Sequence, residues 1–200
     1  MIKENSHGAR GFTLIELMVS VAIFAIIMVI SLGALLSIAA ANRKAETIAS
    51  VMNNLNFAVE GMTRSIRTGY DYHCGTVTGG DCTSGGTYFK FTAQDGSQVV
   101  YAYANDAANC GQTGAVMGCI MRSTDGGTTY LPITAPEVII TNASTGTGLT
   151  FYLRGSTLGN LGDNVQPNVV ITVTGYIQIS ATQKTPFTLQ TSVTQRLYDR

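Results

Sequence analysis

Apolar positions along the chain follow one spacing in the first third and another in the remainder, and each spacing predicts a different kind of element. From Leu17 to Ala41 the chain runs for 25 residues without a formal charge. As a helix this run would be roughly 37 Å long, at about 1.5 Å per residue, which is enough to cross a bilayer. The first part of the chain therefore predicts a transmembrane helix.

Beyond this run the apolar residues form one stripe of an amphipathic helix. They recur every three or four residues with charged and amide side chains between them: Ala41, Ala45, Ile48, Met52, Leu55, Val59, Met62 and Ile66. The two patterns join without a break, so Thr13 to Thr68 predicts a single helix of 56 residues that ends at Gly69. Gly33 is its weak place, since an interior glycine costs about 1 kcal/mol relative to alanine. We expect the stripe to pack on the chain's own domain.

The rest of the chain reads as strands separated by turn residues. The first four candidate strands form two hairpins around Asp95-Gly96-Ser97 and Asp125-Gly126-Gly127. An antiparallel sheet packed on the helical stripe would bury both apolar faces, which predicts an α+β fold with its head at residues 70–200. The candidate strands are Thr87 to Ala93, Gln98 to Ala104, Val116 to Arg122, Thr128 to Ile133, Pro136 to Thr141, Gly148 to Leu153, Val169 to Ile179 and Phe187 to Leu197.

Charge and motif content disfavour several classes of function. The chain has 12 basic and 12 acidic residues, so no bulk charge attracts nucleic acid. It has two histidines, and neither a nucleophile elbow nor a phosphate-binding loop occurs. We therefore expect neither an enzyme nor a bound cofactor.

Four cysteines lie in the predicted head: Cys74, Cys82, Cys110 and Cys119. Four cysteines allow three connectivities, and the short separations favour Cys74 with Cys82 and Cys110 with Cys119. An even count fits an oxidising, extracytoplasmic location. Zinc is the rival interpretation, but structural zinc ligands normally come in pairs two to four residues apart, and His73 reads as a loop residue.

Calcium is a weaker alternative. The ion needs several oxygen ligands, and the short turns Asn105-Asp106 and Asp163-Asn164 each offer a single acid. The turn at Asp163, just before Pro167, reads more simply as a polar turn. We therefore expect no metal site.

A carboxylate at Glu16 interrupts the apolar sequence near its start. Such a group costs about 2.5 to 3.5 kcal/mol near the centre of a membrane, so an acid there needs a partner or must reach the headgroups. A secretory signal cleaved after Ala41 is a further alternative, but the apolar run is too long for one and continues through that position without a turn signal.

The residues around Glu16 carry a resemblance to a known family. Gly11 followed by Phe12-Thr13-Leu14-Ile15-Glu16-Leu17-Met18-Val19 resembles the signature of type IV pilins and of the pseudopilins of type II secretion. The resemblance implies that prepilin peptidase removes a leader, residues 1–11, and that the new amine at Phe12 is N-methylated. It also implies a pilin-like fold, in which residues 12–41 are the membrane and assembly half of the helix and residues 42–69 its amphipathic half. In that family the acid at the position of Glu16 meets the amine of an adjacent subunit.

Scattered residues of the head look like minor subunits of the J or W type. These are the helix end Met62 to Arg67, the strand Phe151 to Leu153 and the closing segment Thr191 to Arg196. The resemblance implies a minor pilin or pseudopilin that starts as a single-pass protein of the cytoplasmic membrane, with an extracytoplasmic head, and then joins a pilus or pseudopilus. Its partners would be the peptidase, other subunits and a membrane assembly platform. The alternative is a membrane-anchored binding or adhesive protein that never polymerises.

Overall fold

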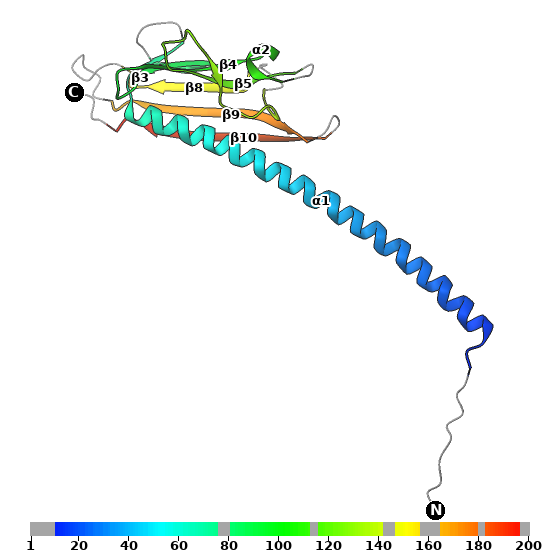
Figure 1. Cartoon of the computed structure of the whole chain (residues 1–200). Coiled ribbons are helices and arrows are strands. Elements are labelled where there is room, and N and C mark those ends of the chain that lie inside the picture. Colours follow the sequence, from blue (N-terminus) through cyan, green and yellow to red (C-terminus); the bar gives the residue numbers. More distant parts are fainter. Residues whose placement is uncertain are drawn as a thin grey trace, which may run out of the picture. The chain divides into compact units, whose positions relative to one another are not determined.

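A long N-terminal helix leads into a head of antiparallel strands (Figure 1). The computed structural model describes residues 11–75, 81–112, 116–141, 147–156, 165–179 and 183–196. The chain forms two compact units, Met1–Glu46 and Thr47–Arg200. The helix α1 (Leu14–Thr68) contributes to both, and it confirms the predicted single helix to within one residue at its start.

The first unit presents apolar side chains along its whole described length. Every described residue from Gly11 to Glu46 is exposed, and α1 is long and apolar enough to cross a membrane. The helix continues through Gly33, and the Ser31 hydroxyl donates to the Ile27 carbonyl at 2.8 Å. The weak place in the sequence therefore does not interrupt the helix.

In the second unit, one face of α1 is buried. Five side chains of this face are buried against the head: Val51, Leu55, Val59, Met62 and Ile66. The stripe expected from the spacing is confirmed from Ile48 onward, with Val51 added. Its first two members, Ala41 and Ala45, are exposed.

The end of α1 is fixed by the residues that follow it. Tyr72 places its hydroxyl 2.6 Å from the Ile66 carbonyl oxygen and 2.8 Å from that of Gly69. A Cβ at Gly69 would collide with the ring of Phe91. Glycine is therefore the residue that this packing favours directly after the last residue of the helix.

The described residues after α1 form ten strands and a short helix, α2 (Ala107–Cys110). The first sheet has the order β1-β3-β4-β5-β6: β1 (Tyr70–Cys74), β3 (Tyr88–Thr92), β4 (Gln98–Ala104), β5 (Cys119–Ser123) and β6 (Leu131–Pro132). The second sheet has the order β10-β9-β8-β2, with β7 also paired to β9: β10 (Lys184–Thr194), β9 (Asn168–Gln178), β8 (Leu149–Arg154), β2 (Cys82–Gly86) and β7 (Val138–Ile140). All described pairings are antiparallel.

The strand predictions are confirmed in outline and corrected in detail. Both predicted hairpins, β3–β4 and β5–β6, are present. The head contains two sheets where the sequence predicts one, and β1, β2 and α2 are not predicted at all. Strand β5 begins at Cys119 and not at Val116, because the backbone of Gly118 is bound by a side chain and by β7.

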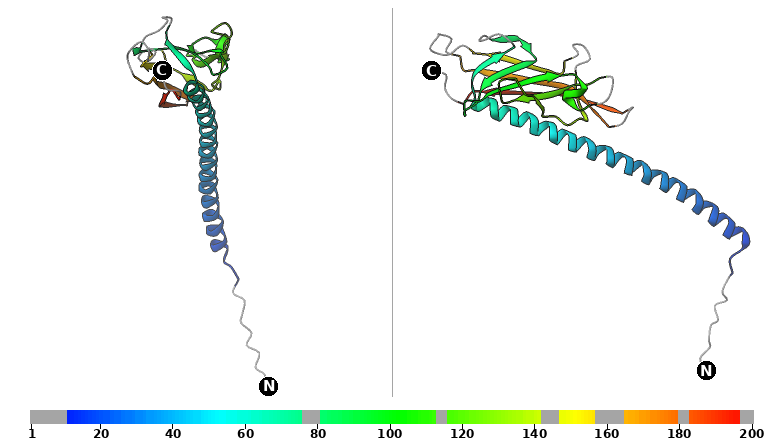
Figure 2. Two further views of the ribbon diagram at one scale, coloured as in Figure 1. Left: turned by 90° about the vertical axis from the view of Figure 1, so that its left-hand side faces the viewer. Right: turned by 45° about the horizontal axis from the view of Figure 1, so that its top comes forward.

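The second half of α1 runs along the sheets (Figure 2). One hydrophobic core joins it to both of them. Phe89 of β3 stacks on Phe151 of β8 with ring centroids 5.2 Å apart, so side chains of the two sheets meet in the centre. Strand β9 alternates as predicted: Val169, Ile171 and Val173 are buried. The residues between them are half-buried on the opposite face.

Strand β10 forms an edge of the second sheet. The Ile179 amide donates to the Gln183 carbonyl at 3.0 Å at the start of the β9–β10 hairpin. Because hydrogen-bonded and non-bonded pairs alternate in an antiparallel ladder, Pro186, opposite Tyr176, falls where the backbone faces away from β9. A proline, which has no N–H, therefore costs no hydrogen bond of this ladder.

Candidate processing and assembly site

The segment before α1 is open and leads into a capped helix. Gly11, Phe12 and Thr13 are exposed and precede the helix, and no atom would lie within 4 Å of a Cβ at Gly11. Thr13 accepts a hydrogen bond on its Oγ1 from the Glu16 amide at 3.4 Å, which is the bond of an N-cap residue. An accessible backbone therefore stands directly before a defined helix start.

Glu16 lies in the first turn of α1. A carboxylate there is favoured by the positive end of the helix dipole, and residues four apart share one helix face. Phe12 is 79% exposed, and none of the described cations lies within ion-pair distance of Glu16. The described part of the chain thus leaves the Glu16 carboxylate available to an outside partner.

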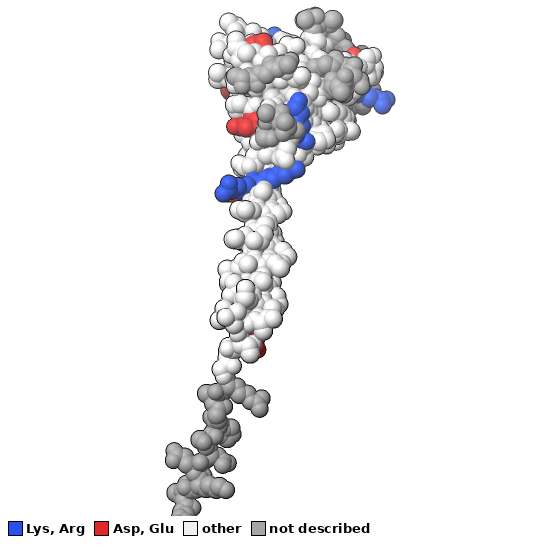
Figure 3. All heavy atoms as spheres, turned by 90° about the vertical axis from the view of Figure 1, so that its right-hand side faces the viewer, with Lys and Arg blue, Asp and Glu red and all other residues white. Residues whose placement is uncertain are grey.

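The surface of α1 beside this site is almost entirely apolar. Figure 3 shows the first part of the helix as a nearly continuous uncharged surface. Large apolar residues along it are about half exposed or more, from Leu14 at 78% to Ile38 at 59%. Such a surface is stable only against lipid or against other helices, so this segment is a candidate membrane and assembly surface.

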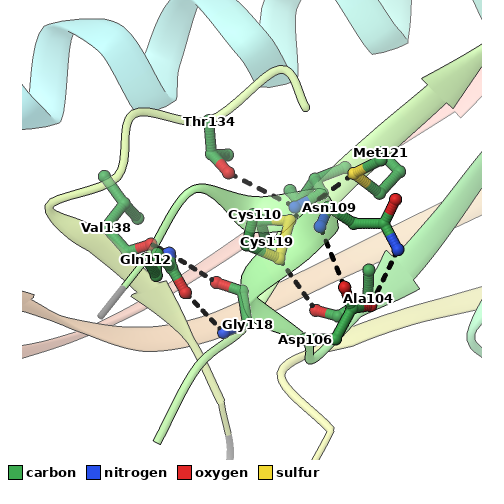
Figure 4. The surroundings of a disulfide bond; sticks show 11 residues. Ala104, Asp106, Asn109, Cys110, Gln112, Gly118, Cys119, Met121, Thr134 and Val138 are labelled. Atoms are coloured by element: carbon green, nitrogen blue, oxygen red, sulfur yellow. Dashed lines mark hydrogen bonds between the residues drawn. A yellow bond between two sulfur atoms is a disulfide. The ribbon is translucent and has the colours of Figure 1, made fainter. Parts of the chain in front are cut away.

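Two disulfides stabilise the head with the pairing that the spacing favours. Cys74 is bonded to Cys82, with 5.9 Å between their Cα atoms, and links β1 of the first sheet to β2 of the second. Cys110 is bonded to Cys119 at a Cα separation of 5.5 Å and links α2 to β5 (Figure 4). Each bridge closes a short loop, which reduces the entropy of the unfolded chain.

A buried glutamine attaches the second disulfide loop to the second sheet. Gln112 donates from Nε2 to the carbonyls of Gly118 at 3.0 Å and of Val138 at 2.8 Å. Its Oε1 accepts from the Gly118 amide at 2.7 Å (Figure 4). The loop is therefore anchored by side-chain hydrogen bonds to the backbone as well as by the disulfide. The sequence contains no local signal for this role of Gln112.

The described residues hold no group of three or more histidine, cysteine, aspartate or glutamate side chains placed to bind a metal. His73 contacts Asp71 at 3.1 Å. Asp106 accepts from the Asn109 amide at 2.9 Å as the N-cap of α2. The calcium candidate at Asp163 and Asn164 lies outside the described residues.

A groove of about 380 Å³ lies on the second unit, between α1 and the first sheet. No sequence pattern indicates this groove, because its walls come from three distant parts of the chain. Its lining residues are Asn54, Phe57, Ala58, Gly61, Met62, Tyr101, Arg122 and Ile133. Burial raises the pKa of Tyr101 above its ordinary value of 10.0, although a hydrogen bond with Ser65 and the charge of Arg122 oppose the rise.

This pKa predicts how the head responds to alkali. The folded state favours neutral Tyr101, so its contribution to stability is fully present below about pH 10, the pKa of an unfolded tyrosine, and is lost as the pH rises through the higher folded value. We expect Tyr101→Phe to flatten the fall in stability above about pH 10, because phenylalanine has no proton to lose in this range. Urea unfolding of both chains across this range would measure the slope, and an unchanged slope would contradict the prediction.

One segment of the chain matches a known protein family. Residues 6–32 match the family described as the prokaryotic N-terminal methylation motif. No curated protein and no solved structure matches. The matched segment contains Gly11, Phe12 and Glu16, together with the first turns of α1. The motif supports a pilin-like protein that prepilin peptidase processes.

Proposed function

We propose that this chain is a structural subunit of a type IV pilus or a type II secretion pseudopilus. The observation that carries the proposal is the methylation motif, which leads directly into a helix whose apolar surface is exposed on all sides. The disulfide-bonded head is consistent with an extracytoplasmic location. Its partners are prepilin peptidase, other subunits and the assembly platform of the cytoplasmic membrane.

Cleavage creates a cation close in sequence to Glu16, whose carboxylate has no cation within ion-pair distance among the described residues. Hydrolysis of the Gly11–Phe12 peptide bond creates an amine at Phe12, and N-methylation leaves that amine cationic. In an assembly of apolar helices the amine of one subunit pairs with Glu16 of its neighbour. Since a buried charge is strongly destabilising without its partner, the pair favours one register between subunits.

We assign the chain to the minor subunits, on the likeness of its head to those of the J or W type. The proposed boundaries are residues 1–11 for the leader, 12–41 for the membrane half of the helix, 42–69 for its amphipathic half and 70–200 for the head. The working role of the protein is mechanical, and no reaction is assigned to it.

Processing is tested by the mass and first residue of the mature chain. In a host that contains the peptidase, we expect the mature protein to begin at Phe12 and to have lost residues 1–11. Gly11→Glu should block cleavage nearly completely, because its side chain crowds the peptidase site. Gly8→Glu, a matched change within the leader, should leave cleavage unchanged. Intact-mass and N-terminal peptide analysis measure both.

Two outcomes would contradict the proposed processing. A mature N-terminus at Asn42 would indicate an ordinary secretory signal, and a chain still starting at Met1 in assembled material would show that cleavage is not required. A chain that is cleaved after Gly11 but never enters a filament would favour the anchored binding protein in place of the filament subunit.

A further inference from the structure

The groove between α1 and the first sheet has features that the fold of a single chain does not require. Phe57 lines the groove but is 76% exposed. It lies outside the buried face of α1, on a part of the helix where most exposed neighbours are polar. An aromatic side chain in this position adds little to the core and offers a large apolar contact to another molecule.

Gly61 provides a second, independent observation. It lies in the interior of α1, where glycine is a poorer helix former than alanine. A Cβ at this position would meet no atom within 4 Å, so nothing in the described packing demands a glycine. Phe57 and Gly61 are four residues apart on one helix face and form a projection next to a hollow. Ala58 adds a second small residue beside them.

One side of the groove is polar because it carries the guanidinium of Arg122. Arg122 is exposed, and it forms no ion pair with the carboxylates that the structure describes. It stands opposite Tyr101 on one neighbouring strand and opposite Leu131 on the other. Residues directly opposite in a sheet share a face, so Arg122 lies between a tyrosine that lines the groove and a leucine that is 68% exposed.

We propose that this groove receives the helix of a neighbouring pilin-type subunit, which presents a carboxylate to Arg122. Small residues at Ala58 and Gly61 let a second helix approach α1 closely, and Phe57 packs beside it, as ridges pack into grooves. The Arg122 guanidinium, which pairs with none of the described carboxylates, selects an acidic side chain on that helix. This inference rests on the proposed function, because an assembly of such subunits supplies the second helix.

The first test separates assembly from stability. Gly61→Leu in the full-length chain should fill the hollow, leave the melting temperature in detergent equal or higher, and lower incorporation into filaments several-fold. Gly61→Ala should raise the melting temperature with a smaller loss of incorporation. A merely structural glycine would move both measurements in the same direction, and that result would overturn the proposal.

The second test addresses the charge. Arg122→Glu should lower incorporation several-fold, whereas Arg122→Lys should retain most of it because the positive charge is kept. Equal incorporation of the wild type and Arg122→Glu would overturn the role of the cation. Cleavage after Gly11 and incorporation of the wild type are measured alongside. Failure of either in the wild type rejects the proposed function, while normal wild-type values with unaffected groove variants reject this inference alone.

The third test identifies the occupant. The photo-crosslinker benzoylphenylalanine placed at Phe57 should join the chain to a peptide from the N-terminal helix of another subunit. The same group at Tyr152, an exposed tyrosine of β8, is the control and should give little of that product. Cross-links only to lipid or to a protein without a pilin-type helix, or equal yield from both positions, would overturn the proposal.

Discussion

Replacing Glu16 with alanine is expected to remove most incorporation into filaments without changing the stability of the head. Glu16 and the head belong to different compact units, and the bond that caps α1 uses the Glu16 amide, which alanine retains. Removing one member of a buried charge pair costs about 3 to 5 kcal/mol. Since about 1.4 kcal/mol corresponds to a factor of ten, the loss in subunit association is roughly a hundredfold or more.

The measurement compares the wild type, Glu16→Ala and Glu16→Gln at equal abundance in the membrane. Glutamine keeps the size of the side chain and removes its charge, so a similar loss in both variants would assign the effect to the carboxylate. The extent of cleavage after Gly11 and the melting temperature of the chain are recorded in the same samples. Normal incorporation of Glu16→Ala would refute the recruiting role, and a carboxylate that reaches the lipid headgroups would then explain its position.

Truncation of Leu55 is expected to have the largest effect on the stability of the head. Leu55 is fully buried on the face of α1 that packs into the core. A leucine-to-alanine change in such a place costs about 2 to 5 kcal/mol, because contacts are lost and a cavity remains. For a unit of this size each kcal/mol lowers the melting temperature by about 2 to 4 °C.

Phe57→Ala is the matched control on the same helix. Its side chain is 76% exposed, so we expect a change of less than about 0.5 kcal/mol in the free energy of unfolding. Thermal unfolding of both full-length variants in detergent measures the difference. Equal destabilisation by the two changes would show that the buried face of α1 does not anchor the head.

The sequence predicts those elements whose side-chain spacing is regular. The single helix is recovered because its apolar spacing persists from the membrane half into the stripe. Strand β4 is predicted with its observed bounds, since Gln98 to Ala104 follows a clear turn at Asp95 and Gly96. The two disulfide pairs follow from separations of 8 and 9 residues.

Elements defined by distant contacts are not visible in the same way. Strand β2 has the composition of a turn, Cys-Thr-Ser-Gly-Gly, and is a strand because it pairs with β8. Strand β1 is irregular: Asp71 adopts a φ of 57° and the register shifts between Tyr70 and His73. The short helix α2 did carry a usable local signal, since Asp106 precedes it and Gly111 follows it.

Of the candidate sites, local sequence indicates only the segment that matches the N-terminal methylation motif. Gly11, Phe12 and Glu16 are close in sequence, so their pattern is readable without a fold. The groove brings Phe57 of α1 together with Tyr101 of β4 and Arg122 of β5, and only the packing of α1 against the first sheet creates it. Gln112 likewise anchors its loop only once the fold brings the carbonyls of Gly118 and Val138 within hydrogen-bond distance.

Pro186 disfavours backbone pairing between the edge strands of heads that are held close together. An edge strand as long as β10, with 11 residues, is a template on which the backbone of another molecule can add, and this is a common route to aggregation. Proline removes one donor from that edge, and Lys184 adds a charge near its start. Both are devices that native proteins use against strand addition. Crowded heads would therefore associate through side-chain surfaces, while unwanted backbone pairing along β10 is discouraged.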